Sequence, residues 1–333
     1  MTQNEIIKAL HQLGTLFESC KPEDDLINKA HIHNKWFTPE MQMAAFKNWA
    51  IQLTEAKLLE WASAYSFSDT PKSVGIIMAG NIPLVGLHDM ICVLVSGHYA
   101  LIKPSSDDSI LTPWIIETLC GIDKRLGERI KQTEKLNTIE ALIATGSNNS
   151  ARHFNYYFKD KPKILRKNRN SVAILTGNES LNQLQDLGSD IFMYFGLGCR
   201  NISKLLVPES YNFDLFFEAI EPYNHCIHHH KYYNNYTYHK AIFLMNLTPH
   251  LDNGFLILKE DDKLASPLGC LFYERFSTTD GAIEYLQNNK EDIQISVGDE
   301  IFGLDCLAFG QSQNTALNDY ADKVNTMKFL NEL

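Results

Sequence analysis

The chain has 333 residues, of which 44% are hydrophobic, and it carries a formal net charge of −10. This length is enough for two domains or one large α/β unit, and the negative charge without a dense Lys/Arg stretch excludes nucleic acid as the main partner. The seven cysteines form no CxxC pair, which indicates a reducing compartment and predicts no metal site. The polar start of the chain and the lack of an apolar run of about 20 residues predict a cytoplasmic protein without stable membrane insertion.

The chain begins with helical patterns and then alternates strands with helices. Apolar residues recur every three or four positions over residues 3–66, and residues 41–64 predict one long helix. From Val74 onward, short apolar runs predict strands over residues 74–80, 99–103, 141–145 and 202–207. A helix is predicted over residues 84–96, between the first two of these strands. This alternation predicts parallel sheets of the doubly wound kind, whose ligands bind beyond the carboxyl ends of the strands.

Three polar clusters follow these strands: Gly80-Asn81-Ile82-Pro83, Lys103-Pro104-Ser105-Ser106 and Gly146-Ser147-Asn148-Asn149. A glycine–serine pair that opens a helix offers N–H groups and the positive dipole end to a phosphate. A lysine held by the following proline can bind a ribose or a phosphate, and an asparagine amide can stabilise a developing oxyanion. Each cluster alone is also typical of a helix cap or a turn, so only their order along the chain is specific.

The segment FGLGCRNISKLLVP sets one cysteine, Cys199, between two glycines and the polar pair Arg200-Asn201. Glycines permit a sharp turn and leave room for a substrate beside the sulfur. A thiolate nucleophile needs nearby positive charge or oriented N–H groups, and Arg200 and the local backbone are the candidates. The pattern also fits a small buried cysteine at a tight turn, because cysteine is commonly buried.

The order of these motifs resembles the aldehyde dehydrogenase superfamily. The motifs that carry the resemblance are Asn81-Ile82-Pro83, Lys103-Pro104-Ser105, Thr145-Gly146-Ser147 and Gly196-Leu197-Gly198-Cys199. Within the superfamily, three segments resemble the acyl-CoA reductases related to LuxC, the acyl reductase of bacterial luminescence. They are GNIPLVGLHDMICVLVSGHYALIKPSS, FGLGCRNISKLLVP and LNDYADKVNTMKFL. The resemblance implies an aldehyde-dehydrogenase-like α/β fold of two doubly wound domains. Residues 1–175 would hold the N-terminal helices and the cofactor-binding domain, and residues 176–333 the catalytic domain.

The activity implied by the resemblance is NADPH-dependent reduction of an acyl-CoA, or a similar fatty acyl thioester, to the aldehyde through a thioacyl-cysteine. Cys199 would be the nucleophile, and Asn81 with the Cys199 N–H would hold the oxyanion. The cofactor would be bound by Lys103, Ser105, Ser106, Gly146 and Ser147. NADPH is favoured over NADH because Ser106 stands where many NAD-specific relatives place a glutamate, which would repel a 2′-phosphate.

Other departures from the aldehyde-oxidising pattern bear on the reaction and on assembly. No carboxylate lies between Ile164 and Leu175, where those enzymes carry a base that activates water, so hydrolysis of an acyl-enzyme should be slow. Many aldehyde dehydrogenases carry a projecting hairpin that is used in oligomer assembly, and residues 66–71 leave no room for it. A monomer or a dimer is therefore predicted. An acyl-supplying partner enzyme is compatible with the resemblance. The competing functions are a cysteine acyltransferase or thioesterase without redox chemistry, and a non-catalytic binding protein.

Two histidine-containing segments invite other interpretations. The run His225-Cys226-Ile227-His228-His229-His230 has metal-ligand residue types but no zinc spacing, and a solvated helix end is the simpler expectation. His88 and Asp89 are candidates for an acid–base pair, although adjacent helical residues point in different directions.

Overall fold

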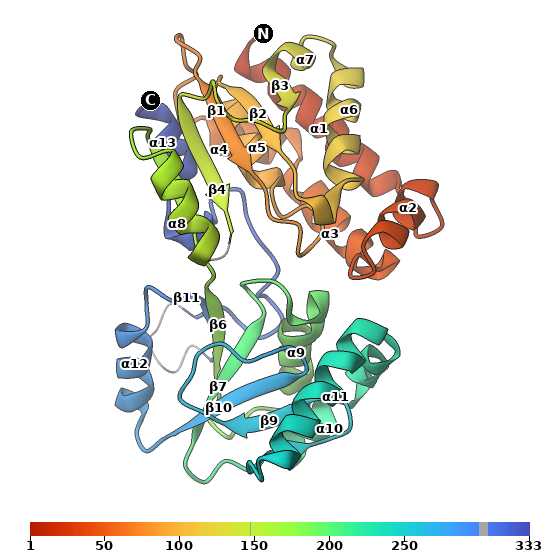
Figure 1. Cartoon of the computed structure of the whole chain (residues 1–333), viewed down its shortest axis with the longest axis vertical. Helices are drawn as coiled ribbons and strands as arrows, with labels where there is room; N and C mark the ends of the chain where they lie inside the picture. Colours follow the sequence, from red (N-terminus) through yellow and green to blue (C-terminus); the bar gives the residue numbers. More distant parts are fainter. Residues whose placement is uncertain (147, 300–305) are drawn as a thin grey trace. The chain divides into compact units, whose positions relative to one another are not determined.

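The computed structural model describes residues 1–146, 148–299 and 306–333. Its contacts divide the chain into two compact units (Figure 1): Met1–Asn168 with Thr315–Leu333, and Arg169–Asn314. The tail of the chain therefore packs with the first unit, whereas the sequence division at residue 175 placed the whole tail in the second domain. Within the described residues, no helix combines the length and the apolar character that crossing a membrane requires.

The first unit begins with four helices: α1 Gln3–Ser19, α2 Asp25–His33, α3 Pro39–Gln52 and α4 Glu55–Ala62. The single helix predicted over residues 41–64 is wrong, because the chain breaks between α3 and α4. The Leu53 carbonyl accepts a hydrogen bond from His11 Nδ1 at 3.1 Å, and Thr54 takes an extended conformation with ψ 143°. Leu53 is fully buried at this break, so packing against α1 outweighs the continuous helical pattern.

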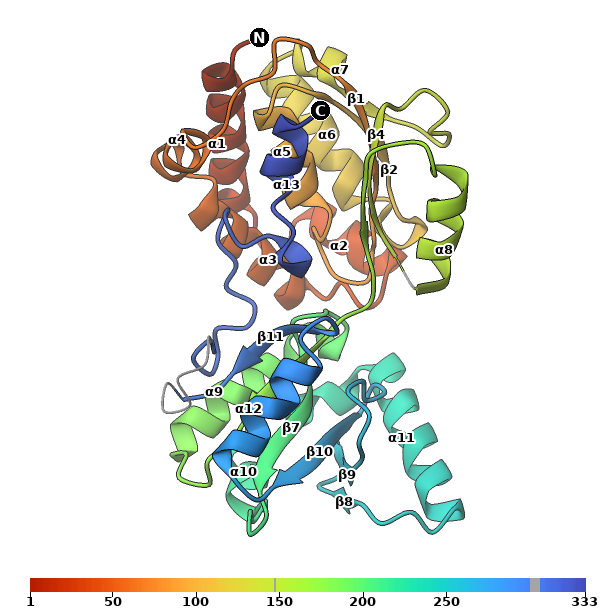
Figure 2. The same cartoon turned by 90° about the vertical axis from the view of Figure 1, so that its left-hand side faces the viewer.

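The first sheet is entirely parallel, with strand order β3-β2-β1-β4-β5. Its strands are β1 Ser73–Ile77, β2 Tyr99–Lys103, β3 Ile130–Gln132, β4 Ala141–Thr145 and β5 Lys163–Arg166. The helices that follow are α5 Leu87–Val95, α6 Leu111–Ile122, α7 Leu126–Arg129 and α8 Asn148–Tyr157, and the tail adds α13 Thr326–Asn331. Figure 2 shows α8 on one face of this sheet and α1, α5 and α13 on the other. The strands predicted over residues 99–103 and 141–145 are confirmed, and the first predicted strand ends earlier, at Ile77.

The second sheet has the order β11-β6-β7-β10-β9-β8, and only the short edge strand β8 is antiparallel. Its strands are β6 Asn170–Ile174, β7 Ile202–Pro208, β8 Leu251–Asp252, β9 Ile257–Glu260, β10 Cys270–Phe276 and β11 Ile293–Val297. The helices are α9 Leu181–Phe192, α10 Asp214–Ile220, α11 His230–Met245 and α12 Thr279–Asn288. Buried residues of β6 and β7 pack against α12, and α9 covers the opposite face of the sheet (Figure 1). Both units are thus α/β layers around parallel sheets, as predicted.

Candidate functional site

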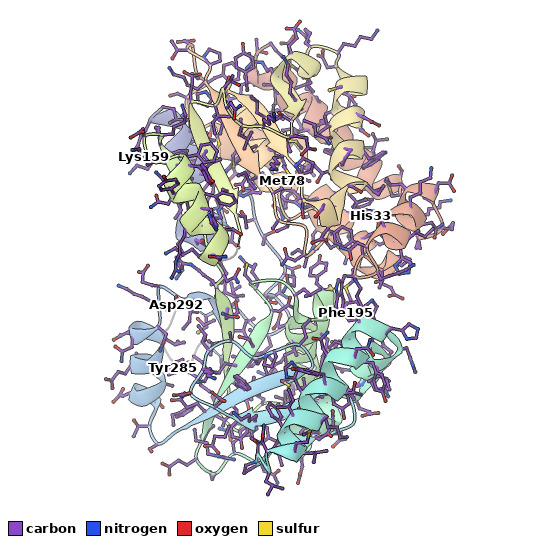
Figure 3. The ribbon with its side chains drawn as sticks, viewed as in Figure 1. His33, Met78, Lys159, Phe195, Tyr285 and Asp292 are labelled. Carbon is purple, nitrogen blue, oxygen red and sulfur yellow. The ribbon has the colours of Figure 1, made fainter. Side chains whose placement is uncertain are left out.

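Cys199 lies exposed in the loop between α9 and β7. The interpretation of this residue as a buried turn cysteine is therefore wrong. The three residues Tyr194, Phe195 and Gly196 at the start of the loop have positive φ angles of 51°, 55° and 79°. This region is unfavourable for residues with a side chain, so two aromatic residues adopt it only because packing holds them there. The Phe195 ring, labelled in Figure 3, lies with its centroid 4.4 Å from the ring of His229.

The side chain of Asn201 holds the cysteine turn together. Its Oδ1 accepts a hydrogen bond from the Gly198 N–H at 2.8 Å, across the turn that contains Cys199. Its Nδ2 donates to the Asp190 carbonyl at 3.0 Å and to the Met193 carbonyl at 2.7 Å. The Asn201 N–H closes the turn by donating to the Gly198 carbonyl at 3.0 Å. A single buried amide therefore fixes both ends of the turn and ties it to the end of α9.

A second set of contacts fixes the main chain around the cysteine. The Cys199 carbonyl accepts a hydrogen bond from Ser171 Oγ at 2.9 Å. Arg200 is buried, and its Nε donates to the Ser312 carbonyl. The Asp190 carboxylate accepts the N–H groups of Gly310 and Ser312 at 2.7 and 2.9 Å. Burial raises the pKa of the Asp190 carboxyl, although these hydrogen bonds act in the opposite direction.

The contact of Arg200 differs from its predicted role as a charge beside the sulfur. Its guanidinium anchors the segment that carries Ser312 to the residue after the cysteine. Support of a Cys199 thiolate by the Arg200 charge stays a prediction.

Exposure distinguishes Cys199 from the buried cysteines of the chain. Cys92, Cys226 and Cys270 are buried. Burial raises the pKa of the Cys226 and Cys270 thiols to about 12, and it raises the pKa of Cys92 well above its ordinary value. These three thiols are therefore poor sources of thiolate at neutral pH.

A cavity of about 170 Å³ adjoins the cysteine turn inside the second unit. Its apolar walls include Phe195, Leu197 and Leu268, and its polar lining includes Asn170 and Asn201. The lining thus combines apolar side chains with several polar groups, which is compatible with a small-molecule pocket.

The residues expected to bind the cofactor belong to the first unit and lie at the end of β2 or after β2 and β4, and Asn81, the expected oxyanion donor, follows β1. Register pairs Ile77 with Lys103 across β1 and β2, so Asn81 and the segment after Lys103 leave the sheet at the same edge. A Cβ at Gly80 would lie 2.7 Å from the Cβ and Oγ of Ser105, so only glycine permits this close approach of the two loops. Lys103 is exposed, as is Asn81.

The remaining predicted cofactor residues have more local roles or lie outside the described residues. Ser105 Oγ accepts the Asp107 N–H at 3.2 Å and so begins the short helix Ser106–Asp108. Gly146 follows β4 at the same edge, and Ser147 lies outside the described residues. The Asp107 carboxylate is exposed one residue beyond Ser106. The prediction of NADPH from Ser106 did not include this negative group.

His88 and Asp89 do not form a pair. His88 Nε2 donates to the Leu317 carbonyl of the tail at 2.9 Å. Asp89 forms a buried ion pair with Arg166, whose guanidinium also donates to Thr326 Oγ1 at 2.8 Å. Both residues thus hold the tail of the chain against the first unit.

The histidine run forms a helix start. His229 Nδ1 accepts the Tyr232 N–H at the first turn of α11, and His225 Nδ1 donates to the Pro222 carbonyl at 2.9 Å. Within residues 1–146, 148–299 and 306–333, no three His, Cys, Asp or Glu side chains gather in a way that could hold a metal ion.

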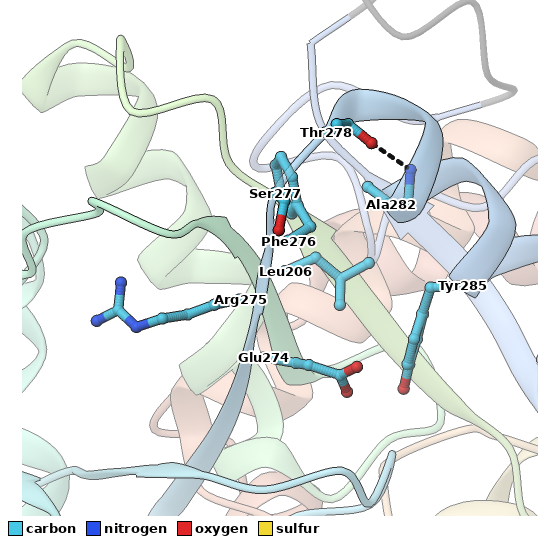
Figure 4. Close-up of a pocket in the computed structure, with 9 residues that line it drawn as sticks. Leu206, Glu274, Arg275, Phe276, Ser277, Thr278, Ala282 and Tyr285 are labelled. Carbon is cyan, nitrogen blue, oxygen red and sulfur yellow. Dashed lines mark hydrogen bonds between the residues drawn. The ribbon is translucent and has the colours of Figure 1, made fainter.

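Lys204, a fully buried cation on β7, was not among the predicted site residues. Its ammonium pairs with Glu274 and lies 4.7 Å from the centroid of the Tyr285 ring. Glu274 and Tyr285 line a cavity of about 280 Å³, and Arg275 points away from them (Figure 4). Two carbonyls, of Asp261 and Asp262, accept further hydrogen bonds from Lys204, so its charge is satisfied within the protein. A lysine within the apolar run ISKLLVP was the available sequence signal.

A family model matches part of the sequence, and solved structures match the fold. A family model described as acyl-CoA reductase (LuxC) matches residues 58–150, and no curated protein matches the chain. A putative aldehyde dehydrogenase from Burkholderia cenocepacia is 14% identical over 91% of this chain and 76% of its own, with a TM-score of 0.66. An oxidoreductase from Marinobacter aquaeolei is 12% identical over 90% and 73%, with a TM-score of 0.68. A betaine aldehyde dehydrogenase from Staphylococcus aureus, solved with NAD+, is 15% identical over 90% and 72%, with a TM-score of 0.64.

These matches confirm three predictions. The fold is that of the aldehyde dehydrogenases, because the structural similarity covers about nine-tenths of the chain. The family match confirms the resemblance to acyl-CoA reductases of the LuxC type and the prediction of an enzyme of this oxidoreductase class.

Proposed function

We propose that this chain reduces an acyl-CoA, or a similar fatty acyl thioester, to the aldehyde, with NADPH as the hydride donor and Cys199 as the nucleophile. The observation that carries the proposal is the structure of the turn that contains Cys199. This turn presents an exposed thiol while four hydrogen bonds of Asn201 and one of Ser171 fix its main chain. A fixed main chain with an exposed sulfur suits nucleophilic catalysis, which requires the sulfur at a defined position beside the substrate.

The first half-reaction is acyl transfer to the cysteine. The Cys199 thiolate attacks the thioester carbonyl carbon, and the Cys199 N–H and Asn81 stabilise the oxyanion. The bond from the carbonyl carbon to the carrier sulfur then breaks, and the carrier thiolate leaves and takes up a proton. The result is an acyl group bound to Cys199 as a thioester.

The second half-reaction is a reduction. NADPH, when bound, supplies the hydride that converts the thioester carbon to the oxidation state of an aldehyde. The chain's own task is then to hold the tetrahedral oxygen until the bond to Cys199 breaks. This last step releases the aldehyde and returns the cysteine as a thiolate.

The residues at the edge of the first sheet fit a dinucleotide by the chemistry of their donors. Lys103 offers an exposed cation, Ser106 an exposed hydroxyl, and Gly146 stands before the N-terminus of α8, where anions are stabilised. We infer that these groups, with Ser105 and Ser147, bind the ribose and phosphates. Asp107 would disfavour a 2′-phosphate if its carboxylate faced the adenosine ribose, so NADPH and NADH must be compared directly.

The decisive experiment measures NADPH oxidation with a panel of acyl-CoAs, with NADH in parallel and the variant Cys199→Ala as the control. We expect oxidation that requires Cys199 and is faster with NADPH. Thioester loss without cofactor oxidation would instead support the acyltransferase or thioesterase. Full turnover by the Cys199→Ala variant would overturn the assignment of the nucleophile.

A further inference from the structure

The last turn of α11 and the loop to β8 carry the most exposed large hydrophobic side chains of the described residues. Leu247 is 89% exposed and Met245 is 84% exposed. With three further exposed side chains of residues 238–251 they form a group that we call the apolar tip: Tyr238, Leu244, Met245, Leu247 and Leu251. In Figure 2 the C-terminal end of α11 leads through this loop to β8, at the end of the second sheet's strand order.

The outward face of α11 changes character along its length. Tyr232 and Tyr236 point inward and are buried. Near the beginning of the helix the exposed side chains include Lys231, Tyr233 and Asn234, of which two are polar, whereas the exposed side chains near its end are apolar. The most exposed apolar side chains of α11 therefore lie at its C-terminal end, and Tyr233 near the beginning is less exposed, at 45%.

Leu247 is unfavourable for folding on two counts, because its apolar side chain is exposed and its backbone is left-handed. It has φ 52°, a left-handed conformation that glycine normally supplies just after a helix. The backbone is nevertheless well held, because the Leu247 N–H donates to the Leu244 carbonyl at 3.1 Å and the Thr248 N–H to the Phe243 carbonyl at 2.8 Å. Neither the backbone conformation nor burial favours a leucine at position 247, so its exposed side chain is available for contact with a partner outside the chain.

Charges near the tip are already neutralised. Lys240 pairs with Asp252 at 2.6 Å, and Lys259 pairs with Asp261. Paired charges lower the cost of bringing this end of the unit near an apolar medium. They also remove the net positive charge that an acidic protein partner would need.

The small size of the tip decides between a lipid surface and a second copy of the chain. Stable protein interfaces bury about 800 Å² on each side, from roughly 20–30 residues, and five side chains cannot supply this area. The edge strand β8 has only 2 residues, so it offers little backbone for pairing with another strand. Insertion into a bilayer surface needs no complementary shape, grows with apolar area, and favours tyrosine at the boundary with water.

We propose that the apolar tip inserts into the surface layer of a lipid bilayer and holds the protein there reversibly. The proposal concerns a surface of the second unit and does not depend on the reaction at Cys199. If the proposed reduction also holds, such an attachment places a fatty aldehyde product next to the phase into which it partitions.

The test is flotation of the full chain with vesicles of phosphatidylcholine, and with vesicles of equal parts phosphatidylcholine and phosphatidylglycerol. We expect the protein to float with both, with little dependence on salt, because the contact is apolar. The double variant Met245→Ser with Leu247→Ser should lower the partition coefficient at least about tenfold, because it removes the two most exposed apolar side chains. The control Ile32→Ser with Tyr157→Ser removes side chains of comparable exposure from the first unit and should float like the wild type.

A single variant separates membrane contact from a structural role. Leu247→Gly should fold at least as stably as the wild type, because glycine suits the left-handed backbone, and it should lose vesicle affinity. Failure of the wild type to float, or equal flotation of wild type and double variant, would overturn the proposal. A wild-type dimer that the double variant converts to a monomer in light scattering would also overturn it, in favour of a second copy.

Discussion

The exposure of Cys199 contrasts with the burial of Cys92, Cys226 and Cys270, and this contrast predicts an order of thiol reactivity. Because only the thiolate reacts and burial raises the pKa of the buried thiols, iodoacetamide at neutral pH should modify Cys199 before these three. Peptide mass spectrometry over time measures the order. A Cys199→Ser variant should lose the fastest phase, and unchanged labelling kinetics in that variant would contradict the prediction.

Asn201 should act as a positioning residue for Cys199. The variant Asn201→Ala leaves the Gly198 N–H and two carbonyls without their side-chain partner, so the turn loosens. We expect kcat to fall on the order of 100-fold, since small displacements of a reacting group have such effects. KM for the cofactor should change little, because the hydrogen bonds of the Asn201 side chain go to Gly198, Asp190 and Met193 and to none of the proposed cofactor residues. An exposed asparagine, Asn212, provides the control through Asn212→Ala, and equal activities of the two variants would refute the role.

For single residues, the sequence pointed to Cys199 as the proposed nucleophile but not to the contacts that hold its turn. Cys199 stands out because glycines flank it, and a flanking pattern is local. The roles of Asn201 and Arg200 depend on carbonyls at Asp190, Met193 and Ser312, and the bond from Arg200 to Ser312 joins residues more than a hundred positions apart. Polar residues beside a candidate nucleophile carry no sequence signal that distinguishes a support from a charge aimed at the sulfur.

Among the elements, the helix break at Leu53 shows why helical spacing alone overestimates helix length. The apolar positions continue through residues 41–64, so the pattern gives no stop signal, and no glycine or proline stands at the break. A hydrogen bond from His11, on a different helix, takes the Leu53 carbonyl. Strands were easier to predict, because β2 and β4 are short apolar runs bounded by polar clusters.

The tail is joined to β5 and α5 by the buried pair of Arg166 and Asp89. Asp89→Ala should destabilise the protein by about 3–5 kcal/mol, because it leaves the buried Arg166 charge without compensation. The double change Asp89→Leu with Arg166→Met should be closer to the wild type, since it removes both charges. Urea unfolding followed by circular dichroism gives these free energies. A double variant as unstable as Asp89→Ala would show that packing, and not charge, dominates.

His98 links the same tail to the first sheet and makes its attachment sensitive to acid. Its Nδ1 accepts the Lys72 N–H at 3.0 Å and its Nε2 donates to the Leu330 carbonyl at 3.0 Å, so the bonded form is neutral. Burial lowers the pKa of His98, so the unfolded chain binds the proton more readily than the folded one. The contribution of His98 to stability is therefore complete above about pH 6.5 and declines as the pH falls below that value.

The measurement is urea unfolding at pH 7.5 and pH 5.5 for the wild type and for His98→Gln. One histidine can change the free energy of unfolding by at most about 1.4 kcal/mol per pH unit. The wild type should lose more stability than His98→Gln over this range. A difference of the opposite sign would mean that protonated His98 is accommodated in the folded state.

For the whole molecule, the resemblance predicted the fold, and composition alone could not have done so. The path of the tail was beyond prediction, because residues 315–333 return to the first unit through contacts with His88, His98 and Arg166. Such contacts depend on pairing between distant parts of the chain. A division of the sequence at a single boundary cannot represent a unit built from two separate segments.

The enzyme as a whole should separate acyl transfer from reduction in time. No carboxylate lies between Ile164 and Leu175 to activate water, so an acyl group on Cys199 should persist when no cofactor is present. Mixing the protein with an acyl-CoA alone should release a burst of about one CoA thiol per chain, detected with a thiol reagent after rapid quenching, and then almost stop. Addition of NADPH should release the aldehyde and restart the release of thiol. Continued thiol release without the cofactor would contradict the reductase and indicate a thioesterase, whereas a missing burst in Cys199→Ala would tie the acyl group to this cysteine.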